Sequence, residues 1–153
     1  MRNLVILIVL MILVAPLVTN QAIAAGAVAV GIAPGGVSRG YASGYAVNQP
    51  NTDAAKTTAL AECKKLRNNV SGTAPGSGTA AAKAMCEVVG TFANKCYAES
   101  LDPMDGTPGV GWAIADTQQQ ADDEALARCR STAGTDRRAF CKVTLRACDG
   151  GSR

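Results

Sequence analysis

Histidine is absent from this sequence of 153 residues. Its absence excludes Ser-His-Asp and Cys-His catalytic arrangements, as well as any metal site with histidine ligands. The six cysteines include no Cys-x-x-Cys pair of the kind that binds zinc. The Gly-rich stretch 26–36 lacks the Lys-Ser/Thr ending of a phosphate-binding loop. We therefore predict no catalytic residue, no metal ligand and no cofactor.

Large side chains and net charge are both scarce. Aromatic residues make up 4% of the sequence, and alanine supplies much of its apolar content. A small domain with so few large side chains usually needs covalent cross-links. The formal net charge of +3 is too small to indicate nucleic acid or an anionic membrane as a partner. The basic stretches 63–67 and 135–140 also lack the interleaved aromatics of single-strand binders, so we predict no nucleic-acid partner.

The N-terminus has the form of a secretory signal peptide, which we place at residues 1–24. Arg2 precedes an apolar run over residues 4–18, and a short polar break follows the run. Ala22 and Ala24 are small residues at the positions that a signal peptidase reads. These features predict a bacterial protein that is secreted or periplasmic.

Cleavage after Ala24 or Ala25 is favoured over an uncleaved anchor. The apolar run is shorter than the roughly 20 residues that cross a bilayer as a helix. We therefore predict no stable membrane span after processing. Residues 25–40 are rich in glycine and small residues, and we expect them to form a flexible leader.

One pattern occurs twice in the chain. Residues 44–63 and 111–129 each begin with Gly-aromatic-Ala-aliphatic and end with Ala-Leu-Ala-x-Cys. The opening four residues are typical of a short strand. The alanines and the cysteine that follow recur at i, i+4 and i+8, along one side of a helix. Asn51 and Thr117 are residue types that cap helix N-termini.

The repeat predicts a small, single α+β domain at residues 41–150. It would consist of two duplicated strand–helix–strand units, copy one at 41–100 and copy two at 108–150. A connector rich in proline and glycine joins them. We expect the helices to pack on one side of a small β-sheet, with disulfides compensating for the light core.

All six cysteines are predicted to form disulfides, because exported chains are oxidised. They are Cys63, Cys86, Cys96, Cys129, Cys141 and Cys148. Three cysteines in each copy require at least one bond between the copies if all six pair. The preferred scheme is Cys63–Cys86, Cys129–Cys141 and Cys96–Cys148, the last joining the copies. The alternative scheme is Cys63–Cys96, Cys129–Cys148 and Cys86–Cys141.

The repeated pattern resembles a bacterial family known as domain of unknown function 4189. The pattern is Gly-aromatic-Ala-Ile-Ala, a capping residue, Ala-x-x-x-Ala-Leu-x-x-Cys and a following Cys-x-Val strand. The resemblance covers about residues 40–150 and is closer in the second copy. It implies a secreted, cysteine-bearing bacterial domain, and it implies no catalytic residues.

Paired carboxylates and a Ser-Lys dyad are the catalytic chemistries that the composition leaves open. A glycoside hydrolase needs two such groups across a cleft, and nothing in the spacing of the acids singles out a pair. The candidates are Glu62, Glu87, Glu99, Asp102, Asp105 and Asp116. Solvated surface acids are the favoured interpretation.

Three functions are therefore considered for the protein. The first is an exported, non-enzymatic binding module whose partner is a protein or an envelope component of unknown identity. The second is a small carboxylate-dependent hydrolase of peptidoglycan or glycan, and the third is a structural envelope component. Tyr45 and Trp112 are expected to be core aromatics, with glycan stacking as the alternative.

Overall fold

The computed structural model describes residues 25–65, 77–104 and 106–152, so the predicted signal peptide lies outside the described residues. The strands are β1 (Ala25–Ile32), β2 (Tyr41–Gln49), β3 (Glu87–Phe92), β4 (Cys96–Leu101), β5 (Val110–Ala115) and β6 (Lys142–Cys148). The helices are α2 (Thr52–Lys64), α3 (Ser77–Ala84) and α4 (Gln118–Thr132), with short 3-10 turns η1 (Val37–Arg39) and η2 (Arg138–Phe140).

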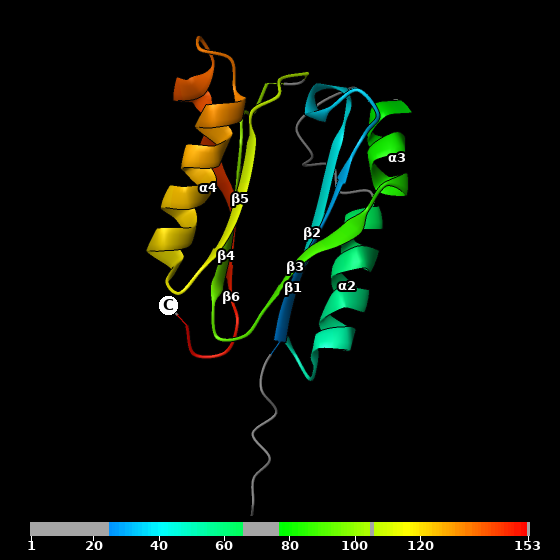
Figure 1. Ribbon diagram of the computed structural model, residues 1–153, viewed down its shortest axis with the longest axis vertical. Coiled ribbons are helices and arrows are strands. Elements are labelled where there is room, and N and C mark those ends of the chain that lie inside the picture. Colours follow the sequence, from blue (N-terminus) through cyan, green and yellow to red (C-terminus); the bar gives the residue numbers. More distant parts are fainter. Residues whose placement is uncertain (1–24, 66–76, 105, 153) are drawn as a thin grey trace, which may run out of the picture.

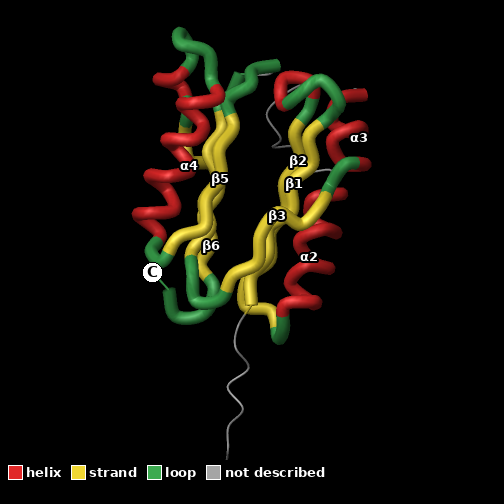
Figure 2. Tube along the Cα trace, viewed as in Figure 1, coloured by secondary structure: helices red, strands yellow, loops and turns green. Residues whose placement is uncertain are grey.

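The strands form two antiparallel three-stranded sheets, with the orders β2-β1-β3 and β5-β4-β6. Figure 1 shows the sheets facing each other, with α4 outside one sheet and α2 and α3 outside the other. Figure 2 shows the same arrangement as layers of helix, sheet, sheet and helix. The α+β class agrees with the sequence prediction. The expectation of one small sheet with both helices on one side is corrected to two sheets, each covered by its own helix.

The predicted flexible leader is also corrected. Residues 25–32 form β1, the central strand of the first sheet, and all but the last of them are buried. The apolar run Ala-Gly-Ala-Val-Ala-Val-Gly-Ile has no polar alternation because both of its faces are covered, one by α2 and one by the second sheet. The halves of the structure are therefore residues 25–92 and 96–148, not the copies predicted from the repeat.

Both long helices begin where the sequence predicted a cap. The Asn51 side chain accepts a hydrogen bond from Ala54 N, and Thr117 accepts one from Gln120 N. Each helix buries two alanines and a cysteine along one stripe, Ala55, Ala59 and Cys63 in α2 and Ala121, Ala125 and Cys129 in α4. A further helix, α3, lies between α2 and Cys86.

Glycine lets each helix lie directly against its sheet. A Cβ atom at Gly44 would lie 2.1 Å from Cys63 N, and one at Gly111 would lie 2.2 Å from Ala125 O. Real Cβ atoms do not approach backbone atoms this closely. The small residues of the strands and helices therefore face each other, and the interfaces between helix and sheet consist mainly of alanine.

The large side chains lie between the two sheets. This inner cluster buries Val28, Val30, Tyr41, Phe92, Tyr97 and Leu101. Tyr45 and Trp112 pack partly buried against it, and the Tyr45 ring stacks on Tyr97 with the ring centres 5.7 Å apart. The strands β1, β2, β4 and β5 thus present small residues toward the helices and large residues toward the other sheet, following the period of two along a strand.

Three disulfides join Cys63 to Cys86, Cys96 to Cys148 and Cys129 to Cys141. These are the pairs of the preferred scheme. Two of them are alike: the helix-end cysteine is bonded to the cysteine before the next strand, with Cα atoms 6.1 and 6.0 Å apart. They fix the C-terminal end of each helix to its own half.

The third disulfide joins the two predicted copies, but both of its cysteines lie in one sheet and therefore in one half of the structure. Cys96 opens β4 and pairs with Cys148 of β6 in the same sheet. The cysteines are therefore divided two and four between the halves, not three and three. No disulfide crosses the interface between the sheets, since all six cysteines are accounted for by the three bonds.

Adding one methyl group at Gly111 is expected to destabilise the protein strongly. Gly111→Ala would force α4 away from β5, and we expect a loss of about 2–3 kcal/mol in the free energy of unfolding. Urea unfolding of the disulfide-bonded protein measures this. Gly151→Ala is the matched control, because no atom lies within 4 Å of a Cβ there. Equal stability of the two variants would contradict the packing argument.

Candidate functional site

Glu99 is a carboxylate buried between the two sheets, with 4% of its surface exposed. It lies on β4, and its side chain shares the inner face with Tyr97 and Leu101. The hydroxyls of Tyr41 and Tyr97 donate hydrogen bonds to Oε2 over 3.1 and 3.2 Å. Tyr41 belongs to the opposite sheet, so this polar cluster joins the two halves.

Burial raises the pKa of Glu99, and hydrogen bonds from Ser43, Tyr41 and Tyr97 oppose that rise. The pKa values of Tyr41 and Tyr97 are raised as well, first by burial and then by the charge of Glu99. The two phenols therefore stay protonated and act as donors. The cluster holds one carboxyl group that can gain or lose a proton inside the interface.

A cavity of about 130 Å³ opens beside Glu99, between the edge strands β2 and β6. Its lining combines apolar, hydroxyl and charged groups. The residues are Ala42, Ser43, Gly44, Tyr45, Cys63, Lys65, Glu99, Leu101, Thr144 and Leu145. Glu99 and Lys65 are the charged members of this lining. Lys65 follows α2, its side chain is 62% exposed, and its Nζ pairs with Glu62.

The other acids considered from the sequence lie apart from this cavity lining. Asp116 forms an exposed ion pair with Lys95, and Glu87 lies exposed at the start of β3. Glu62 is on α2 and pairs with Lys65, and Asp105 lies outside the described residues. Of the acids in that set that the structure describes, none other lines the cavity beside Glu99. Among the described residues, no group of three or more Cys, Asp or Glu is placed to hold a metal ion.

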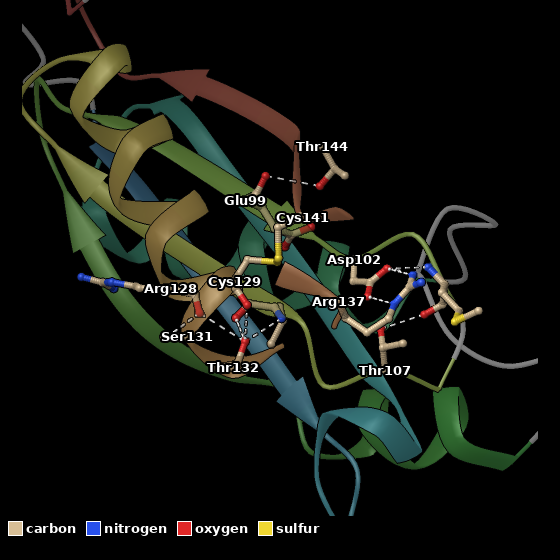
Figure 3. Close-up of a disulfide and its surroundings, with 12 residues drawn as sticks. Glu99, Asp102, Thr107, Arg128, Cys129, Ser131, Thr132, Arg137, Cys141 and Thr144 are labelled. Atoms are coloured by element: carbon tan, nitrogen blue, oxygen red, sulfur yellow. Dashed lines mark hydrogen bonds and ion pairs between the residues drawn. A yellow bond between two sulfur atoms is a disulfide. The ribbon is translucent and has the colours of Figure 1, made fainter. Parts of the chain in front are cut away.

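Asp102 forms a partly buried ion pair that connects two segments of the second half. It is fully buried, and its carboxylate accepts hydrogen bonds from Arg137 Nε and Nη2 over 2.9 and 2.7 Å. Figure 3 shows this pair near the Cys129–Cys141 disulfide. The hydrogen bonds from Arg137 lower the pKa of Asp102. The pair fixes the loop after β4 to the segment before β6.

Asp149 joins the halves at one end of the sheets, and the sequence analysis missed it. It is fully buried, and its carboxylate accepts hydrogen bonds from Asn48 N over 2.6 Å and Asn94 N over 3.2 Å. Asn48 and Asn94 have positive φ angles of 55° and 52°, a conformation that asparagine tolerates better than most residues. Asn94 lies in the turn between the halves, so Asp149 holds that turn in place.

One serine motif in the chain also has a structural explanation. Residues 36–40 read Gly-x-Ser-x-Gly, the letter order of a nucleophile elbow. Ser38 lies in η1, between two antiparallel strands, whereas the elbow needs a turn from strand to helix. The motif therefore belongs to the β1–β2 connection.

The family model for domain of unknown function 4189 (DUF4189) matches residues 25–148. The chain belongs to this DUF4189 family. The match includes β1 and ends at Cys148, so it covers both sheets of the DUF4189 domain described above. Comparisons with curated proteins and with solved structures gave no match.

Stability of the DUF4189 domain is expected to depend on pH through Glu99. Because its pKa is raised in the folded state, its stabilising contribution is present below about pH 4.3, the pKa of an unperturbed Glu, and is lost as pH rises through the folded value. Glu99→Gln keeps an acceptor for the tyrosines and removes this titration. We expect the stability of the variant to increase relative to wild type as pH rises from 4 to 7.

Urea unfolding at several pH values tests this expectation. Glu87→Gln, which changes an exposed acid at the start of β3, should show no such trend relative to wild type. A constant difference between wild type and Glu99→Gln across this range would contradict a raised pKa at Glu99.

Proposed function

We propose that this DUF4189 protein is an exported, non-enzymatic binding module whose ligand enters the Glu99 cavity. The observation that carries the proposal is a cavity with a buried carboxylate and an apolar wall. Ligand sites combine apolar walls with a few placed polar groups in this way. A volume near 130 Å³ suits a small molecule, or a group that protrudes from a larger envelope component.

The cavity supports binding better than carboxylate-dependent hydrolysis. A glycosidase needs two carboxyl groups about 5–9.5 Å apart on either side of the scissile bond. Among the described residues that line the cavity, Glu99 is the one acid. Its tyrosine and serine neighbours hold it in place with hydrogen bonds, an arrangement that favours recognition.

Export is part of this proposal. Three disulfides indicate that the protein folds in an oxidising compartment outside the cytoplasm. The described residues contain no helix that is long and apolar enough to cross a membrane. Together with the predicted signal peptide, the disulfides support a secreted or periplasmic location.

We further infer that the two halves derive from a duplication. Both have the order strand, strand, long helix, strand, with α3 as an addition in the first half, and in both sheets the first strand is central. Gly44 and Gly111 make the same close contact with the helix, and the disulfides at the helix ends are alike. These likenesses extend the sequence repeat by one strand at the start of each unit.

A thermal shift experiment tests the binding function. The processed, disulfide-bonded protein is mixed with small-molecule fractions from the envelope of its native host. At least one fraction should raise Tm by about 3 °C, roughly 1 kcal/mol for a domain of this size. Leu145→Trp, which fills the cavity, should abolish the rise. Val89→Trp on β3, outside the lining, should leave it unchanged.

Two results would overturn the proposal. One is the absence of any stabilising fraction, which would favour a structural envelope component. The other is hydrolysis of peptidoglycan or glycan that falls a hundredfold in Glu99→Gln with folding intact. That loss corresponds to about 2.7 kcal/mol of transition-state stabilisation and would favour the hydrolase.

A further inference from the structure

We propose that the Glu99 cavity binds a small zwitterion of the α-amino acid type, with its ammonium group toward Glu99 and its carboxylate toward Lys65. The inference rests on the proposed binding function and names its ligand class. It follows from three features of the lining: a buried carboxylate, a lysine side chain at the exposed end and an apolar wall.

The buried carboxylate of Glu99 would be stabilised by a cation in the cavity. Among the described residues, the hydrogen bonds to the Glu99 carboxylate come from the hydroxyls of Tyr41, Tyr97 and Ser43, and all three groups are neutral. A buried carboxylate is costly unless it is paired with positive charge as well as hydrogen-bonded. A ligand ammonium in the adjoining cavity would supply that charge and favour the ionised carboxylate.

The ammonium group of Lys65 can bind an anionic group at the exposed end of the cavity. Lys65 follows the last residue of α2, and its backbone N–H bonds to Ala61 O and Glu62 O, which holds the residue at the helix end. Its side chain is largely exposed and pairs with Glu62. Exposed pairs of this kind contribute about 0–1 kcal/mol, so a ligand carboxylate can share or replace that contact at little cost.

The size and the wall of the cavity limit the ligand. An apolar cavity of about 150 Å³ holds benzene, which has six heavy atoms. The Glu99 cavity is slightly smaller, and Leu101, Leu145 and Tyr45 form its apolar wall. A compact aliphatic amino acid such as valine fits this description, with its carboxylate left at the exposed end. Oligosaccharides and long peptides are too large to enter.

A matched series of three ligands tests the assignment. Valine carries both charges, isobutylamine lacks the carboxylate, and isovalerate lacks the ammonium. Calorimetric titration of the processed, disulfide-bonded protein should show valine binding at least tenfold more tightly than either analogue. Each charge contributes to valine binding, so each deletion should weaken it.

Two substitutions assign the charges to their residues. Glu99→Gln should weaken valine at least tenfold and remove its advantage over isovalerate. Lys65→Met should remove the advantage of valine over isobutylamine. The controls are Glu87→Gln and Lys64→Met, both exposed and outside the lining, and they should bind valine as wild type does. If Glu99→Gln fails to fold, the surface variant Lys65→Met still tests whether Lys65 binds the ligand carboxylate.

The inference is overturned if valine binds no more tightly than isobutylamine or isovalerate, or if none of the three binds. If an envelope fraction still stabilises the wild-type protein and not Leu145→Trp, the cavity binds another class of ligand and the proposed function stands. If no fraction does so either, both proposals fail.

Discussion

The close approach of each helix to its sheet is the constraint on which the rest of the structure depends. Gly44 and Gly111 leave no room for a side chain between strand and helix, so the facing positions are occupied mainly by alanine. Such thin interfaces bury little apolar area per residue and contribute correspondingly little stability. A disulfide at the end of each helix compensates by restricting the unfolded chain.

Small residues on the outer faces leave the larger side chains on the inner faces. The two sheets therefore meet through branched and aromatic residues, and within this contact Glu99 is held by hydroxyls from both sheets. Asp149 adds a second polar connection at one end. The halves are thus held together by packing and hydrogen bonds, and the cavity is lined by residues of both halves, including the edge strands β2 and β6.

The sequence predicted the local features and missed those that depend on tertiary contacts. The caps at Asn51 and Thr117 and the small-residue stripes were readable because they depend on neighbouring residues. β1 was missed because a strand buried on both faces lacks alternation and follows an apolar leader. Glu99 could have been singled out, since it stands between Tyr97 and Leu101 on one strand face. The role of Asp149 depends on two distant backbone amides and left no local signal.

The central claim is that the halves 25–92 and 96–148 are cross-linked internally and joined without a covalent bond other than the chain itself. Disulfide mapping by mass spectrometry, after digestion of the denatured and unreduced protein, tests it most directly. The account predicts the linked pairs Cys63–Cys86, Cys96–Cys148 and Cys129–Cys141. A linked peptide pair that joins Cys63 or Cys86 to any cysteine of the second half would contradict it.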